Sequence, residues 1–146
     1  MAPTSSFPPD LTPAILEPGG TELGALFAQL GAYNRAAVEA WSKSSFSLVL
    51  RNGAGTLVGG GHAEVLLGLA EIRAVWVEEA RRGQGLGRAL VGAIEAAAQE
   101  RGARRAFLYT YSFQARGFYE GLGYRLLASL PFPEGDVERH YFTRDL

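Results

Sequence analysis

Two arginines and three alternate glycines interrupt the stretch VWVEEARRGQGLGRALVGAIE. β-forming residues precede this junction, and an apolar pattern of helical period follows it. Gly83, Gly85 and Gly87 let the main chain pass close to a ligand, and they point N–H groups at it where the positive end of a helix begins. Arg82 and Arg88 add guanidinium charge. The spacing therefore predicts a corner that binds phosphate.

Two familiar nucleotide motifs do not fit this junction. The dinucleotide fingerprint G-x-G-x-x-G needs a glycine where Arg88 stands, and the phosphate loop G-x-x-x-x-G-K-[ST] is absent from the sequence. The segment instead resembles the acyl-CoA motif Q/R-x-x-G-x-G/A of the GNAT superfamily, the acyl-CoA-dependent N-acyltransferases. The hexapeptide RGQGLG, which starts at Arg82, matches every fixed position. For this hexapeptide alone, a glycine-rich strand-to-helix turn without a ligand is the alternative.

A second resemblance to the same family lies downstream. Its members carry a helix of the form N-x-x-A-x-x-L-Y-x-x-x-G-F, and this chain has SFQARGFYEGLGY. Ala115, Tyr119 and Gly123 match that form, whereas Ser112 stands in place of the usual asparagine. With both motifs in order, the resemblance covers nearly all of the chain from residue 12 onward.

The resemblance implies how acyl-CoA binds. In the family, two neighbouring parallel strands splay apart, and the pantetheine arm lies in the gap, hydrogen-bonded to the first strand as another strand would be. Acetyl-CoA is the expected co-substrate, and no metal is expected. The cofactor-binding residues expected from this arrangement are Val75, Trp76, Val77, Arg82, Gly83, Gln84, Gly85, Leu86, Gly87, Arg88 and Ser112.

Tyr119 is the candidate general acid. Its position matches the tyrosine with which many family members protonate the departing thiolate, and a phenol that points into the cleft is able to do so. The alternative is a tyrosine that only packs beside Phe118 on its own helix.

Glu71 is the weaker candidate for the base that deprotonates the amine. It lies six residues before Val77 on the expected strand, and alternation along a strand predicts that both face the same side. Arg73 is predicted to share that face, so an ordinary ion pair between Glu71 and Arg73 is one alternative. Deprotonation through ordered water, as in many family members, is the other.

Other titratable residues are predicted to have no catalytic role. His62 and His140 lie far apart and are expected to be structural. The acidic residues Glu134, Asp136 and Glu138 could attract a cationic amine, but acidic loops are mostly solvated.

Composition narrows the function further. With 146 residues, 47% of them apolar, the chain can bury one core and is too short for two ordinary domains. Its formal net charge of −1 argues against binding nucleic acid or an anionic membrane by charge alone. The absence of cysteine excludes disulfides, thiolate catalysis and thiolate metal sites. Because no segment reaches the length of a membrane span, a cytoplasmic location is expected.

The elements that must position these residues alternate in type. We predict an α/β fold of the α+β type, with a mixed, mostly antiparallel central sheet flanked by helices. Residues 1–11 are expected to form a flexible arm, and 12–146 a single GNAT-like domain. The expected elements are a short strand over 12–17, two helices over 21–41 divided at Gly31, a hairpin of SFSLVL and LVGGGHAEVL around RNGAGT, the strand LAEIRAVWV, a helix from Leu86, and then a strand at 105–111, a helix at 113–122 and strands at 124–130 and 138–146.

The helix after the glycines has the clearest pattern. Leu86, Leu90 and Ile94 form one apolar stripe, Glu95 is expected on the solvent side, and Gly102 sits where a C-cap is expected.

The whole pattern predicts an enzyme that transfers an acetyl or longer acyl group from acyl-CoA to a primary amine. Two alternatives remain: a module that binds acyl-CoA without turnover, and a protein-interaction domain without a cofactor. The acceptor is not identified, because acceptor specificity is expected in the N-terminal helices and the last hairpin. Whether the chain forms a homodimer is left open.

Overall fold

The computed structural model describes residues 7–146, so residues 1–6 of the predicted arm lie outside the described part. Residues 7–11 contain one turn, in which the Leu11 N–H donates to the Pro8 carbonyl oxygen at 3.0 Å, and no helix or strand. The chain divides into two compact units, Met1–Glu39 and Ala40–Leu146, which are described separately. The prediction of one domain over residues 12–146 stays a prediction.

The described residues of the first unit contain a single helix, α1 (Glu22–Ala37), which runs through Gly31. The predicted division at this glycine was wrong. One glycine costs about 1 kcal/mol relative to alanine in a helix interior, and the alanines, leucines and glutamine around it are strong helix formers. The predicted strand over residues 12–17 was also wrong, because that segment pairs with no other strand among the described residues of its unit.

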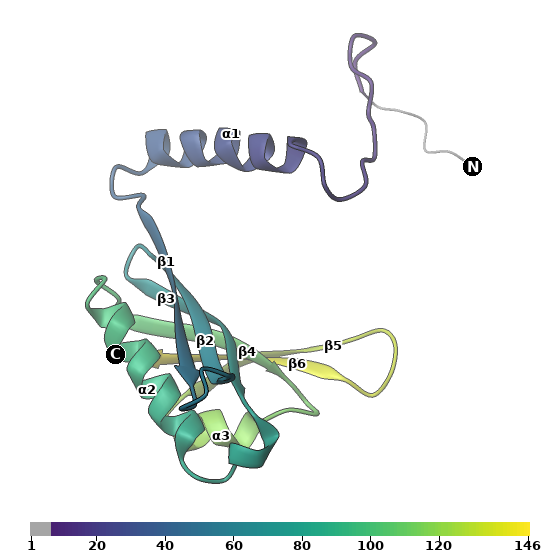
Figure 1. Cartoon of the computed structure of the whole chain (residues 1–146). Coiled ribbons are helices and arrows are strands. Elements are labelled where there is room, and N and C mark those ends of the chain that lie inside the picture. Colours follow the sequence, from purple (N-terminus) through teal and green to yellow (C-terminus); the bar gives the residue numbers. More distant parts are fainter. Residues whose placement is uncertain (1–6) are drawn as a thin grey trace. The chain divides into compact units, whose positions relative to one another are not determined.

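The second unit contains a six-stranded sheet in the order β1-β2-β3-β4-β6-β5 (Figure 1). All neighbouring strands are antiparallel except β3 and β4, which are parallel. The sheet therefore confirms the predicted fold class. The strands are β1 (Lys43–Arg51), β2 (Leu57–Leu66), β3 (Leu69–Val77), β4 (Arg105–Tyr111), β5 (Arg125–Pro131) and β6 (Glu138–Asp145).

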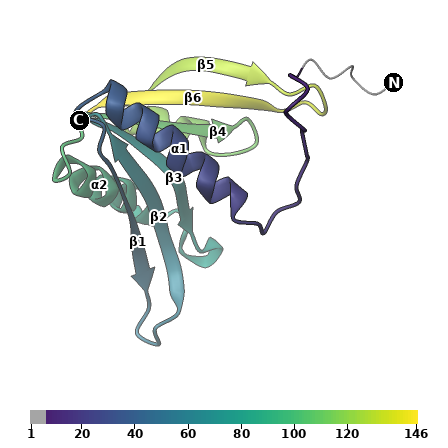
Figure 2. The same cartoon turned by 90° about the horizontal axis from the view of Figure 1, so that it is seen from above.

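Two helices and one short turn of 3-10 helix complete this unit. They are η1 (Glu79–Arg81), α2 (Leu86–Gln99) and α3 (Arg116–Gly121). α2 lies along one face of the sheet and packs on β2 and β3 (Figure 2). α3 begins three residues later than predicted, because the Gln114 side-chain oxygen accepts bonds from the Tyr111 N–H and the Thr110 hydroxyl and holds this segment as a turn. No helix of the described residues is both long and apolar enough to span a bilayer.

The core of the second unit lies between α2 and the sheet. Leu90 and Ile94 of α2 are buried against the strands, as the apolar stripe predicted. Gly61 on β2 makes this close approach possible. A Cβ atom there would lie 2.6 Å from the Ala74 carbonyl oxygen and even closer to the Ile94 side chain. The buried residues of this core are Ala63, Ile72, Leu90, Val91, Ile94, Ala106, Leu108, Tyr124 and Phe142.

Glu95 is buried, although the helical pattern placed it on the solvent side. Its carboxylate accepts a hydrogen bond from the Tyr124 hydroxyl at 2.7 Å and is paired with the Arg144 guanidinium at 3.0 Å. A buried carboxylate is tolerated when it is paired in this way. The pattern could not indicate the burial, because both partners are distant in the sequence and only the folded sheet brings them to Glu95.

Gly61→Ala should lower the free energy of unfolding by about 1–3 kcal/mol, because the added methyl group overpacks the contact between β2 and α2. Gly92→Ala is the matched control. Gly92 lies inside α2, and a Cβ atom there meets nothing within 4 Å, so alanine should stabilise the protein by about 0.5–1 kcal/mol. Urea unfolding of both variants measures the two effects. Equal stability of Gly61→Ala and the wild type would contradict the packing argument.

Candidate active site

β3 and β4 pair over only three positions before they separate. Their ladder joins Leu69 to Arg105, Ala70 to Ala106 and Glu71 to Phe107, and it ends there. A hollow of about 220 Å³ lies beyond this point, between the last residues of the two strands. The splayed parallel strands implied by the family resemblance are therefore present. This gap is lined by Ile72, Arg73, Ala74, Val75, Leu108, Tyr109, Thr110, Tyr111, Gln114 and Tyr119.

A β-bulge in β3 changes which side chains face the core. His62 of β2 pairs with Ala74 and Ala63 pairs with Ile72, so Arg73 is the extra residue. As a result, Ile72 before the bulge and Val75 after it pack in the same core. Simple alternation fails across the bulge, and the prediction that Glu71 and Val77 share a face was wrong.

Arg73 also has a different partner from the one expected. Its guanidinium forms an ion pair with Glu64 of β2 at 3.2 Å, which raises the pKa of Arg73, and the charge of the more distant Glu71 raises that pKa further. The Lys43 ammonium, 3.0 Å from the same carboxylate, lowers the pKa of Glu64, and Arg73 lowers it further. Glu71 lines neither the gap nor the glycine junction. Its role as a base stays a prediction.

The glycine junction forms a second hollow, of about 560 Å³, at the start of α2. Gly85 is the N-cap residue of α2, with φ of 79°, and Gly83 has φ of 73°. These are left-handed conformations that favour glycine. The first-turn N–H groups of α2 have no acceptor within the helix. The residues that line this phosphate corner are Val75, Val77, Arg82, Gly83, Gly85, Gly87, Arg88, Ala115, Phe118 and Tyr119.

Both predicted arginines border the phosphate corner. The Arg82 Nε donates to the Val77 carbonyl oxygen at 3.0 Å, and the Arg88 guanidinium donates to the Gly121 carbonyl oxygen at 3.4 Å. Both side chains are exposed, and neither forms an ion pair with a described residue. Their charge is therefore available to an anion.

Four predicted contacts lie outside this lining: Trp76, Gln84, Leu86 and Ser112. The Ser112 hydroxyl accepts a hydrogen bond from the Glu138 N–H at 3.0 Å and so joins the end of β4 to the start of β6. Their contacts with a cofactor stay predictions. Conversely, sequence reasoning missed the two apolar residues Ala115 and Phe118, which line the corner. The signal for Ala115 was its match to the second family motif, and Phe118 lies in the same motif directly before Tyr119.

Tyr119 on α3 lines both the gap and the phosphate corner. Its ring packs against Phe118 at 5.0 Å and Tyr124 at 5.9 Å between centroids. Within the described residues its hydroxyl has no hydrogen-bond partner, and it is not among the fully buried polar atoms. Burial of the ring raises the pKa of Tyr119, so the phenol keeps its proton at neutral pH. The side chain is packed and its hydroxyl is free, which suits a proton donor.

Comparison with known proteins agrees with the geometry. The model of the Acetyltransferase (GNAT) family matches residues 20–124. The chain is 38% identical over 94 residues to a blasticidin-S acetyltransferase of Streptomyces morookaense, covering 63% of this chain and 68% of the relative. The crystal structure of an acetyltransferase from Bacillus cereus matches with a TM-score of 0.79 and 28% identity, over 92% of this chain and 98% of that one.

A further structure shares the fold alone. An aminoglycoside 6'-N-acetyltransferase complexed with coenzyme A has a TM-score of 0.62 and 20% identity, over 83% of this chain and 91% of that one. The chain thus belongs to the GNAT acetyltransferase family and is an N-acetyltransferase of that type. The family uses acetyl-CoA as the acyl donor.

The buried Tyr124 and the half-buried Tyr119 should make stability depend on alkaline pH. Burial raises the pKa of Tyr119 and of Tyr124 above the usual 10.0, and the Glu95 carboxylate raises that of Tyr124 further. Above about pH 10 the unfolded phenols ionise while the folded ones stay protonated, so the free energy of unfolding should fall as pH rises. Tyr119→Phe should make this fall shallower in urea unfolding at alkaline pH. An unchanged slope would show that Tyr119 ionises freely in the folded protein.

Proposed function

We propose that this chain transfers the acetyl group of acetyl-CoA to a primary amine by direct attack in a ternary complex. The observation that carries the proposal is the place of Tyr119, whose side chain borders both the phosphate corner and the gap between β3 and β4. A proton donor for the leaving thiolate is needed where the two substrates meet, and Tyr119 stands between the two hollows.

In this proposal acetyl-CoA, the acyl donor, lies along the phosphate corner and the gap between β3 and β4. The pyrophosphate binds the N–H groups at the start of α2 and the charges of Arg82 and Arg88. The pantetheine arm follows the end of β3, where the ladder to β4 has ended and Val75 and Val77 have no strand partner on that side. The Val77 carbonyl oxygen already accepts the Arg82 Nε–H, so the main chain of Val75 offers the unoccupied groups. The thioester then reaches Tyr119.

The reaction needs a neutral amine and two proton transfers. The amine nitrogen attacks the thioester carbonyl, a C–N bond forms, and the C–S bond breaks. Tyr119 gives its proton to the departing sulfur. The amine loses its proton to water in the cleft, with Glu71 as the alternative base. The free hydroxyl of Tyr119 favours this reaction over binding of acyl-CoA without turnover.

The acceptor is a proposal of its own. Because a relative is named for blasticidin S, that compound is the first acceptor to test. A panel of other small amines and of peptides with a free amino terminus would show whether this chain accepts a compound other than blasticidin S. The signal is the release of coenzyme A.

Tyr119→Phe should slow turnover by about 10²–10⁴-fold, because it removes the proton that the leaving thiolate needs and keeps the ring and its packing. Acetyl-CoA affinity should change little. The measurement is the rate of coenzyme A release against pH for both proteins, with affinity from calorimetry. Equal rates and superimposable pH profiles would show that Tyr119 only packs in the structure and does not protonate the leaving thiolate.

Gly85→Ala should weaken acetyl-CoA binding by roughly tenfold or more, which is about 1.4 kcal/mol, because the side chain keeps the phosphate from the backbone. Gly102→Ala is the matched control. Gly102 also has a positive φ, of 86°, with nothing near its Cβ position, and it lies at the other end of α2. Both variants should lose similar stability, about 1–2 kcal/mol, from the left-handed conformation. If both bind acetyl-CoA as the wild type does, the corner is not the phosphate site.

A further inference from the structure

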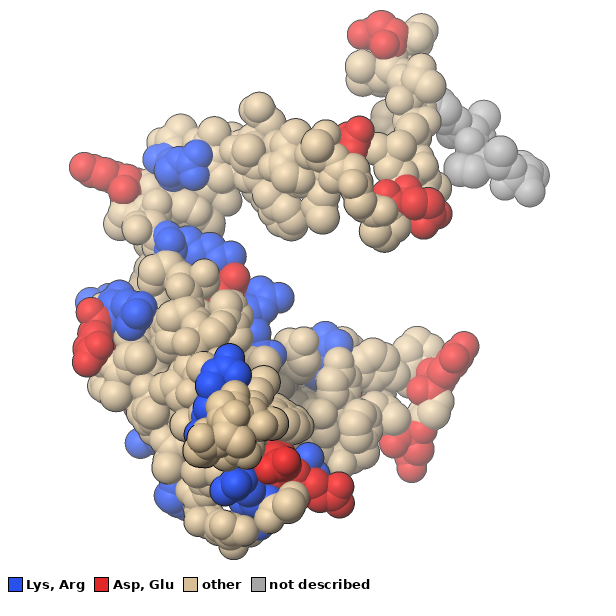
Figure 3. Space-filling model, viewed as in Figure 1, with Lys and Arg blue, Asp and Glu red and all other residues tan. Residues whose placement is uncertain are grey.

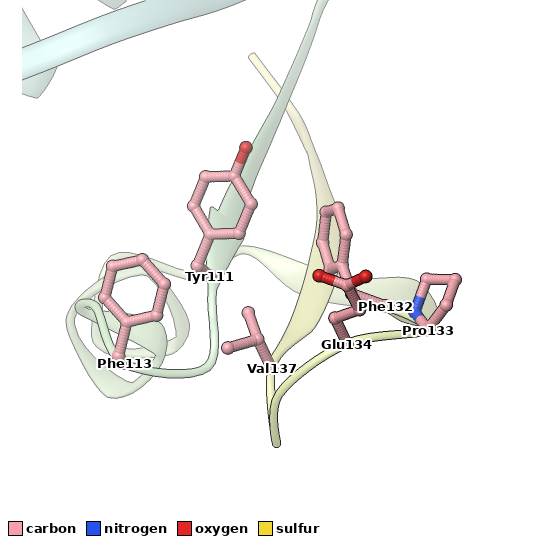
Figure 4. A pocket seen from close by; sticks show the side chains of 6 residues that line it. All are labelled: Tyr111, Phe113, Phe132, Pro133, Glu134 and Val137. Carbon is pink, nitrogen blue, oxygen red and sulfur yellow. The ribbon is translucent and has the colours of Figure 1, made fainter.

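A third hollow lies between the end of β4 and the β5–β6 hairpin. Its volume is about 490 Å³, which suits a small molecule. Figure 4 shows Tyr111 and Phe113 on one side and Phe132, Pro133 and Glu134 on the other. None of its six lining residues was assigned above to binding the donor. They are Tyr111, Phe113, Phe132, Pro133, Glu134 and Val137.

Three of the six lining residues are aromatic. Tyr111 and Phe113 stack with centroids 5.4 Å apart and planes 8° apart, and Phe132 lies 5.9 Å from Tyr111. Arg139 donates to the Tyr111 hydroxyl at 2.8 Å and fixes that ring. Phe113 is 70% exposed, so an aromatic surface stays open at the hollow. Such a surface favours flat groups and cations.

Charge separates the two ends of this hollow. The Arg139 guanidinium lies over the rings of Tyr109, Tyr111 and Phe132, 4.4 to 5.4 Å from their centroids, and its charge opposes a cation close to it. Glu134 has no ion-pair partner among the described residues. Acidic side chains gather at the tip of the β5–β6 hairpin (Figure 3). A cation is therefore favoured at the rim, next to Glu134, with a flat group against Phe113.

The hollow adjoins the gap of the proposed reaction at Tyr111. Tyr111 lines both this hollow and the gap between β3 and β4, and Tyr119 lines that gap and the phosphate corner. A molecule whose amine reaches Tyr119 from the gap can extend past Tyr111 toward Glu134. The side of the cleft away from the phosphate corner is thus aromatic and acidic.

We infer that this hollow holds the far end of the acceptor, and that the acceptor is a small molecule with a primary amine, a flat ring and a second, cationic group. The inference rests on the proposed function, since it names the substrate class for the same cleft. The ring packs on Phe113 and Phe132, and the cationic group pairs with the Glu134 carboxylate.

Two probes of equal shape test the inference. para-(Aminomethyl)benzamidine carries a primary amine, a ring and a cationic amidinium, and para-(aminomethyl)benzamide replaces the amidinium by a neutral amide. We expect the wild type, saturated with coenzyme A, to bind the amidine about tenfold more tightly in calorimetry. Glu134→Gln should reduce this ratio to about one. Asp136→Asn, which removes the same charge from the same loop without touching the hollow, should keep it.

The outcomes separate the inference from the proposed function. Equal binding of both probes to the wild type, a ratio that survives Glu134→Gln, or no binding of the amidine at about 1 mM would each overturn the inference. Phe132→Leu should weaken both probes and keep their ratio. Failure of the proposed function shows differently, as absent acetyl-CoA binding or absent coenzyme A release with every amine, and the contrast between the probes is then measured on the protein without coenzyme A.

Discussion

The early end of the ladder between β3 and β4 is the constraint on which the site depends. Two parallel strands that pair at Glu71 and Phe107 and then separate leave main-chain groups of β3 without a strand partner. The bulge at Arg73 accompanies the separation and keeps Val75 in the same core as Ile72, so β3 stays anchored while its far edge opens. A sheet that closed along its whole length would have neither the gap nor access to Tyr119.

The buried groups on the other side of the core hold this opening in place. Glu95 on α2 joins Tyr124, just before β5, to Arg144 on β6, and the Tyr124 ring packs against Tyr119. Removing Arg144 or the Tyr124 hydroxyl leaves the buried Glu95 carboxylate less compensated, so the network favours one arrangement of α2, β6 and the segment that carries Tyr119. The position of Tyr119 in the site thus depends on the hydrogen-bonded network in the core.

The cleft changes in character from one end to the other. Arg82, Arg88 and the start of α2 make the phosphate corner positive, whereas the hollow at the hairpin is aromatic and carries Glu134 at its rim. Opposite charges at the two ends suit an anionic acyl donor and a cationic acceptor. Like charges would repel each of them from the other's end. Tyr119 lies between them.

The sequence by itself determined the features that depend on local conformation: the sheet-and-helix fold class, the β1–β2 hairpin, the helix after the glycines and the left-handed glycines of the phosphate corner. These features follow from the apolar periodicity, the turn residues and the φ preference of glycine, all of which depend on residues close together in the sequence. Tertiary structure decided the rest. The bulge at Arg73 arises from pairing with β2, so strand alternation misplaced Glu71, and Glu95 is buried because Tyr124 and Arg144 approach it from distant segments. The hollow at Glu134 likewise exists only because β4 ends beside the β5–β6 hairpin, a proximity that no spacing within the chain records.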